Sequence, residues 1–115
     1  MIKLKRENCA VLHLPLKRKW YDMIASGEKR EEYRDHSPYW TTRIRNAIRK
    51  DKKCIVAAFS LGRNMATMFF DVLVIKAVSG SDHPEWGEPK HLHWMILLGS
   101  RVELDGRVKL DGGTK

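Results

Sequence analysis

The sequence predicts an α+β domain, with a small curled β-sheet or β-barrel of about five to six strands and two helices packed at its ends. Two amphipathic stripes in the first half of the chain predict the helices, and several short apolar runs predict the strands. Helices and strands do not alternate along the chain, which excludes a doubly wound α/β fold. A sheet of this size protects its edges best by curling, which favours a barrel-like architecture.

The length of 115 residues fits one domain, which we assign to residues 1–110, followed by a tail over residues 111–115 that we expect to be disordered. No apolar run approaches the roughly 18 residues of a membrane helix, and no secretory signal is evident at the N-terminus. We therefore expect a cytoplasmic protein that does not insert into membranes. Cys9 and Cys54 form no CxxC motif, and we expect both to pack as small apolar groups.

Capping and stripe signals define two helices. Pro15 suits the first turn of a helix, and apolar residues spaced by four, seven and eight positions predict that this helix covers residues 16–26. A second helix begins at Ser37 as the cap and Pro38 as the first helical residue, and it ends in the basic run over residues 50–53.

Apolar runs predict five strands at Cys9–Leu14, Cys54–Leu61, Met65–Val78, Trp94–Leu98 and Arg101–Leu104. The third run is long and apolar on both faces, which indicates a bent strand with a bulge near Asp71. The polar segment 28–35 is expected to form a short strand that is exposed or lines a cleft, and residues 1–8 form a frayed arm or an edge strand. Asp105-Gly106 predicts a hairpin turn that leads to a further strand at Arg107–Leu110.

The charge of the chain is uneven. Residues 1–53 contain 15 Lys and Arg against 7 Asp and Glu, so they carry the whole net charge of +8. A basic field attracts polyanions, among which phosphates are the obvious partners. A solubility surface explains the same charge, so both interpretations stay open at this point.

One polar segment, GEKREEYR at residues 27–34, follows the end of the first predicted helix. In a strand, Glu32 and Arg34 point to the same face, whereas Lys29 has the opposite parity unless it lies on the turn before the strand. A carboxylate between two cations stays ionised and fixes their geometry, which would create a polar site. The alternative is a solvated, charged edge strand.

The spacing G-x-K-x-x-E-x-R, formed by Gly27, Lys29, Glu32 and Arg34, resembles the signature of the ASCH domain, a family with a PUA-like β-barrel fold. The preceding W-x-x-x-I-x-x-G pattern is similar to the helix that leads into that signature. EEYR, PYWTTRI and PEWGEP resemble segments of small stand-alone bacterial and phage members. The resemblance spans roughly residues 11–104.

The resemblance implies a module that binds RNA or a nucleotide ligand in a cleft between barrel and helices, with Lys29, Glu32 and Arg34 lining that cleft. It also implies an alternative, because some small relatives are amidohydrolases acting on N4-acetylcytidine. Those enzymes have a Lys at the position of Lys29 and a Thr three residues later, where this chain has Glu32. The hydroxyl nucleophile is therefore missing here.

In a hydrolase acting on a modified nucleoside or on RNA, the same three side chains are the candidate catalytic residues. Lys29 would act as base or electrostatic group, Glu32 as proton shuttle or orienting group, and Arg34 would hold a developing oxyanion. An adaptor role with an acidic protein partner is a third class that the sequence leaves open. Motifs for a cofactor are absent, and the pair His91 and His93 lacks an evident third ligand, so no metal site is predicted.

Three further residues are candidate ligand contacts. Tyr39 opens the second helix and is positioned to reach the cleft, and Arg43 lies on a basic face of that helix. Trp86 lies in a Pro/Gly loop, where it serves either as a stacking platform for a base or as an anchor for the loop. Trp20 and Trp40 are assigned to packing because of their helical spacing.

Overall fold

The computed structural model describes residues 1–105, which form six strands in one mixed sheet, two α-helices and two 3-10 turns. The α+β class predicted from the sequence is therefore confirmed. In chain order the elements are β1 (Ile2–Lys5), η1 (Arg6–Asn8), β2 (Cys9–Leu16), α1 (Arg18–Ala25), β3 (Glu31–Asp35), α2 (Pro38–Arg49), β4 (Cys54–Leu61), β5 (Met68–Val78), η2 (Pro84–Trp86) and β6 (His93–Asp105).

The sheet has the strand order β1-β6-β5-β4-β2, and β3 also pairs with β6. Strand β3 pairs with residues 93–97 of β6, whereas β1 pairs with residues 102–105 further along the same strand. The β1–β6 and β2–β4 pairs are parallel, and the other pairs are antiparallel. Within residues 1–105 no strand pairing joins β2 to β3 or β1, so the sheet is not closed into a barrel and the barrel stays a prediction.

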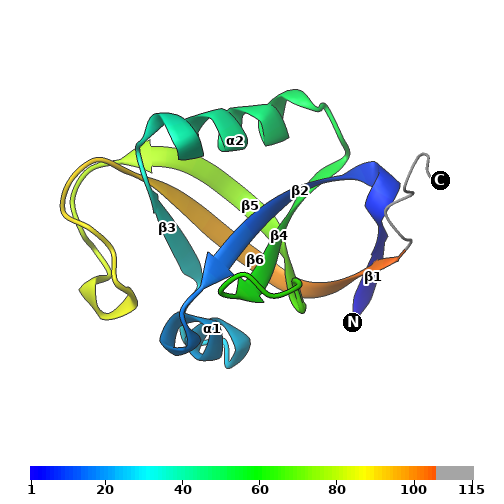
Figure 1. Ribbon diagram of the computed structural model, residues 1–115, viewed down its shortest axis with the longest axis horizontal. Helices are drawn as coiled ribbons and strands as arrows, with labels where there is room; N and C mark the ends of the chain where they lie inside the picture. The colour runs from blue at the N-terminus through cyan, green and yellow to red at the C-terminus, as the bar shows by residue number, and fades with distance from the viewer. Residues whose placement is uncertain (106–115) are drawn as a thin grey trace.

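The two edges of the sheet are nevertheless linked. Because η1 connects β1 on one edge directly to β2 on the other, the chain itself joins the edges at one end (Figure 1). At the other end, Arg34 Nη2 in β3 donates a hydrogen bond to the carbonyl oxygen of Pro15 in β2, at 2.7 Å. A side chain thus spans the gap that a backbone ladder would fill in a closed barrel.

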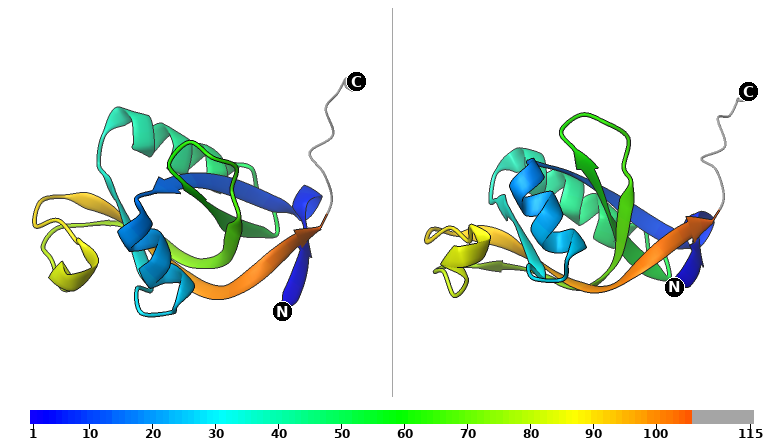
Figure 2. Two further views of the ribbon diagram at one scale, coloured as in Figure 1. Left: turned by 60° about the horizontal axis from the view of Figure 1, so that its bottom comes forward. Right: turned by 90° about the horizontal axis from the view of Figure 1, so that it is seen from below.

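The helices lie at opposite ends of β3, as Figures 1 and 2 show. Ser37 caps α2, because its Oγ accepts a hydrogen bond from the backbone N–H of Trp40 at 3.3 Å, and Pro38 begins the helix as predicted. The main core cluster is built from twelve buried residues, namely Leu12, Leu14, Leu16, Ile24, Ile44, Ala57, Phe59, Met68, Phe70, Trp94, Ile96 and Leu98.

The predicted start of the first helix is wrong. Pro15 belongs to β2, which continues to Leu16, and α1 covers only Arg18–Ala25. Proline has no backbone N–H to donate, so it is tolerated in an edge strand, and β2 is an edge of this sheet. The local signal for a helical first turn was therefore overridden by the strand's position in the sheet.

The strands predicted at Trp94–Leu98 and Arg101–Leu104 are one continuous strand, β6, so that separation is also wrong. The bend in β5 is confirmed, because its register with β6 shifts between Phe70 and Val72 and again between Val72 and Val74. The N-terminal residues form the edge strand β1. The predicted hairpin strand Arg107–Leu110 and the tail 111–115 lie outside the described residues.

Cys9 and Cys54 lie opposite each other in the β2–β4 register, with their Sγ atoms 2.7 Å apart. Burial, followed by the contact with Cys54, raises the pKa of the Cys9 thiol to about 12, so this thiol is protonated near neutral pH. Over residues 1–105 the structure contains no helix with the length and apolar character needed to cross a membrane.

A buried contact between a carboxylate and an imidazole organises the loop between β5 and β6. Glu88 accepts hydrogen bonds from the backbone N–H groups of Asp82 and His83, at 2.8 and 2.9 Å, and it contacts His93 Nε2 at 2.9 Å. His93 is fully buried, and its Nδ1 faces the carbonyl oxygen of His91 at 2.7 Å. Both ring nitrogens of His93 thus have a polar partner within hydrogen-bond distance.

We expect Glu88→Gln to lower the free energy of unfolding by about 2 kcal/mol near neutral pH, the usual contribution of a hydrogen bond to a charged group. Burial by itself raises the pKa of Glu88, but the hydrogen bonds from His93, His83 and Asp82 outweigh it and lower the pKa below 4.5. The stability that this carboxylate contributes is therefore present above pH 4.5 and is lost as the pH falls through the lowered pKa. Urea unfolding from about pH 7 to about pH 3 measures both effects.

The control is Glu85→Gln, which changes an exposed carboxylate in the same loop. We expect this variant to unfold close to the wild type at every pH. The role of Glu88 is contradicted if Glu88→Gln is as stable as the wild type near neutral pH and loses as much stability as the wild type when the pH is lowered.

Candidate functional site

The signature segment connects α1 to β3. Gly27 adopts a φ of 87°, which favours glycine and ends the helix, and the backbone N–H of Lys29 then bonds to the carbonyl of Met23 at 3.0 Å. Because β3 begins only at Glu31, Lys29 lies on the turn before the strand. The alternation of side chains along a strand therefore does not constrain Lys29, and its side chain lies on the same side of β3 as the side chains of Glu32 and Arg34.

The carboxylate of Glu32 lies between the two cations. Its Oε1 is 3.3 Å from Lys29 Nζ, and its Oε2 accepts a hydrogen bond from Arg34 Nε at 2.8 Å and a second one from Arg34 Nη2. The side chains of Lys29 and Glu32 are only 1% and 7% exposed. The three predicted signature residues thus converge in one buried cluster, which we call the ion cluster (Lys29, Glu32 and Arg34).

Lys29 is the most deeply placed member of the ion cluster. Its Nζ donates to the carbonyl oxygens of Glu31 at 2.6 Å and Trp86 at 2.9 Å, in addition to the Glu32 contact. All three ammonium protons therefore have acceptors within the protein. Burial lowers the pKa of Lys29 from its ordinary value of 10.5, and the nearby Glu32 carboxylate partly opposes this shift.

Arg34 is fixed by contacts on several sides. Besides its bonds to Glu32 and Pro15, its guanidinium lies 4.7 Å from the ring centroid of Trp40, in a cation–π contact. Its Nη1 makes no hydrogen bond within the part of the chain that the structure describes. Arg34 therefore combines a rigid position with a donor that is open to a ligand.

A pocket of about 490 Å³ lies over the ion cluster, and we call it the signature pocket. Its wall includes three of the four tryptophans of the chain, Trp20, Trp40 and Trp86. The remaining lining residues are Pro15, Leu16, Lys17, Lys29, Glu32, Tyr33, Arg34, Asp35 and Gly87. Indole rings beside a guanidinium and a carboxylate suit a flat, polar ligand that stacks and forms hydrogen bonds.

The loop wall of the signature pocket is anchored through its backbone. Trp86 provides the carbonyl that Lys29 binds, and Gly87, at a φ of 82°, lies so close to Trp20 that a Cβ there would be 2.8 Å from the ring. The indole of Trp86 stacks on His83 with centroids 4.1 Å apart. The backbone of this loop thus anchors it, and the half-buried Trp86 is among the residues that line the pocket.

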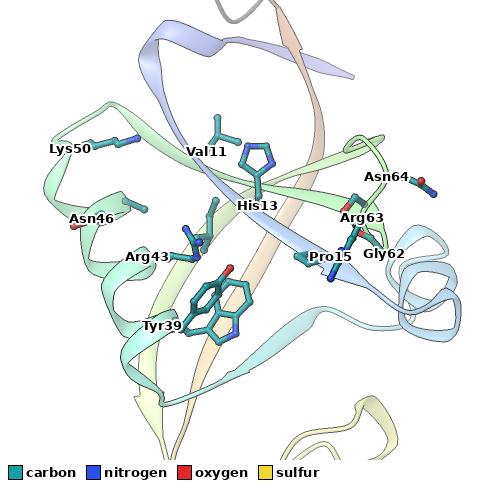
Figure 3. A pocket seen from close by; sticks show the side chains of 14 residues that line it. Val11, His13, Pro15, Tyr39, Arg43, Asn46, Lys50, Gly62, Arg63 and Asn64 are labelled. Carbon is teal, nitrogen blue, oxygen red and sulfur yellow. Dashed lines mark hydrogen bonds between the residues drawn. The ribbon is translucent and has the colours of Figure 1, made fainter.

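Tyr39 and Arg43, which were also predicted as ligand contacts, line a different cavity. This cavity of about 540 Å³ lies between α2, β2 and the turn after β4, and Figure 3 shows its side chains. We call it the α2–β2 groove. Four of the six predicted residues therefore line the signature pocket, namely Lys29, Glu32, Arg34 and Trp86. The other two line the neighbouring α2–β2 groove.

Sequence reasoning missed part of both cavities. Trp20 and Trp40 were assigned to packing because of their helical spacing, and both do pack against the core, but their rings also line the signature pocket. Pro15 was assigned to a helix, so the sequence did not predict that it lines both cavities. His13 and Arg63 in the α2–β2 groove carried no local signal, because only the strand pairing brings them beside α2.

Comparison with family models, curated proteins and solved structures gives no match for this chain. Among the side chains of residues 1–105, no group of three or more His, Cys, Asp and Glu is placed to hold a metal ion. Function must therefore be argued from the chemistry of the two cavities.

We expect Lys29→Ala to lower the free energy of unfolding by about 3–5 kcal/mol, because it leaves Glu32 without one buried partner and two carbonyl oxygens without donors. Lys29→Met keeps the apolar stem and avoids the cavity, so it should lose less. Chemical denaturation followed by tryptophan fluorescence measures the difference.

Lys19→Ala serves as the matched control, since Lys19 also lies over the Trp20 ring but is exposed. Its effect should stay within about 0.5 kcal/mol, as for ordinary surface positions. Equal losses for Lys29→Ala and Lys19→Ala would show that the ion cluster does not hold the site together.

Proposed function

We propose that this chain is an ASCH-type module that binds RNA or a nucleotide ligand in the signature pocket. The observation that carries the proposal is the ion cluster beneath a pocket with three tryptophans in its wall. Any nucleobase can stack on an indole ring, and hydrogen bonds between fixed polar groups and the edge of the base then determine which base binds. The positive charge of residues 1–53 supports an anionic ligand.

We also assign the fold to the PUA-like barrels as part of this proposal. Support comes from the single mixed sheet whose two edges are linked by η1 and by the Arg34–Pro15 hydrogen bond. Arg34, one of the signature residues that suggest the family, makes the side-chain part of this link, so fold and site share this residue.

The ion cluster gives the ligand a fixed set of polar contacts. Arg34 presents its Nη1 donor, and Glu32 presents carboxylate oxygens that are held between two cations. Donors and acceptors that are held in place before binding cost little ordering entropy when the ligand arrives. This preorganisation supports recognition of a small planar group such as a nucleobase.

Short single-stranded RNA should quench the tryptophan fluorescence of the protein and bind more weakly as salt rises, with a log–log slope of about −0.7 for each phosphate contacted. Trp86→Ala should lower the affinity by about tenfold, because stacking contributes about 1–3 kcal/mol per base. Fluorescence titration at several salt concentrations measures the affinity and the slope.

Leu92→Ala is the control variant, because Leu92 is an exposed apolar residue near the same loop and lines neither cavity. The proposal is wrong if RNA fails to bind at low salt. It is also wrong if Trp86→Ala binds as tightly as Leu92→Ala.

A hydrolytic role for the same residues has less support. A general base needs a free lone pair, whereas the Nζ of Lys29 directs its protons to Glu31, Trp86 and Glu32. Glu32 is likewise occupied by Lys29 and Arg34. Saturated contacts of this kind suit groups that position a ligand rather than groups that transfer protons.

Incubation of the protein with N4-acetylcytidine should therefore yield no cytidine above the rate in buffer, as followed by liquid chromatography. The Lys29→Met variant provides the comparison. Turnover by the wild type that this variant loses, while remaining folded, would favour the hydrolase over the binding module.

A further inference from the structure

The α2–β2 groove collects positive charge without any acidic side chain. Arg43 and Lys50 extend from α2, while Arg63 extends from the turn after β4 on the opposite side of the cavity (Figure 3). His13 of β2 lies between them. No Asp or Glu is among the described residues that line the groove. Cations that converge on a hollow from several elements repel one another, and a bound anion relieves that repulsion.

The cations of the groove are available to a ligand. Within residues 1–105, the side chains of Lys50 and Arg63 make no hydrogen bond or ion pair. The Arg43 side chain also makes none within this range, and its guanidinium lies 4.1 Å from the centroid of the Tyr39 ring in a cation–π contact. By contrast, Arg34 in the signature pocket is held by hydrogen bonds from Nε and Nη2 to Glu32 and Pro15, which leave only Nη1 open in the described part of the chain. The groove therefore differs from the ion cluster, since its charge is not neutralised from within.

Tyr39 adds a stacking surface to this charge. The residue is 58% exposed, and one side of its ring carries the Arg43 guanidinium. Exposed aromatic rings next to cations are the combination by which proteins hold single-stranded nucleic acids, since bases stack on the rings and cations contact the backbone. An acidic peptide offers charge but no planar rings, so it uses only half of this surface.

The groove adjoins the signature pocket. Pro15 and Trp40 line both cavities, so the two cavities lie next to each other. The Trp40 ring contacts Arg34 in the signature pocket and the neighbouring Tyr39, whose centroid is 5.1 Å away. The two cavities thus meet at Pro15 and Trp40, close enough for one extended ligand to contact both.

From these observations we infer that the α2–β2 groove binds the phosphate backbone of a single-stranded RNA whose base occupies the signature pocket. The inference rests on the proposed function and deepens it, because it makes the ligand an oligonucleotide rather than a free nucleoside. Arg43 and Arg63 contact phosphates from the two sides, and Tyr39 stacks on a base next to the one in the signature pocket.

The test compares two double variants that each remove two positive charges. Arg43→Ala/Arg63→Ala removes two arginines that line the groove, whereas Arg45→Ala/Arg49→Ala removes two exposed arginines of α2 that do not line it. Binding of an oligouridylate of about eight nucleotides is measured over a range of salt concentrations, with Trp86→Ala examined in parallel. Chemical denaturation checks that every variant is folded.

We expect the groove variant to bind at least about tenfold more weakly, since each lost contact to a charged group is worth about a factor of ten. Its salt slope should become shallower by about 1.4, at 0.7 for each phosphate contact. The control variant should keep the wild-type slope. If the two double variants behave alike while Trp86→Ala still weakens binding, the inference is overturned and the proposed function stands.

The opposite result is equally informative. Loss of binding in the groove variant with no effect of Trp86→Ala removes the signature pocket as the ligand site, and it therefore overturns both the proposed function and the inference that one RNA occupies both cavities. An oligoaspartate of matched charge provides the last comparison. If it binds as tightly as the RNA and depends equally on Arg43 and Arg63, the partner is an acidic protein segment and the RNA inference fails. If RNA does not bind at all, both proposals fail.

Discussion

The carboxylate of Glu32 is the constraint on which the rest of the site depends. It holds Lys29 through one oxygen and Arg34 through the other, and each cation then reaches a distant backbone carbonyl. Lys29 binds the carbonyl of Trp86 in the long loop, and Arg34 binds that of Pro15 in β2. One acidic group thus fixes three separate segments. Buried ion clusters add little net stability compared with apolar residues of the same volume, so the value of this cluster lies in positioning.

The two cavities differ in how their charges are balanced. In the signature pocket the two cations share the Glu32 carboxylate, so the three side chains hold one another in a fixed geometry. In the α2–β2 groove Arg43 and Arg63 lack an acidic neighbour, so they act through attraction at longer range. A charged field that gathers the ligand and a rigid pocket that orients it are complementary requirements of selective binding.

Local signals in the sequence were sufficient wherever structure is decided by neighbouring residues. The Ser37-Pro38 start of α2, the bend of β5 and the strand at β3 could all be predicted in this way. Contacts between segments that are distant in the sequence could not be predicted from such local signals. The role of Lys29 depends on a loop 57 residues away, and β6 runs through a stretch that suggested two strands. Pro15 has the chemistry of a helix start, and only its position on the sheet edge explains why it belongs to a strand.

The position of Pro15 has one more consequence, which concerns self-association of the protein. An unpaired edge strand is a template on which a second copy of the chain can add its own strand. Pro15 offers no N–H for such pairing, and its carbonyl oxygen is already occupied by Arg34. At Pro15 the free edge of β2 therefore offers neither a backbone donor nor a free acceptor to a second strand, and residues that line the signature pocket also hinder strand addition at this point.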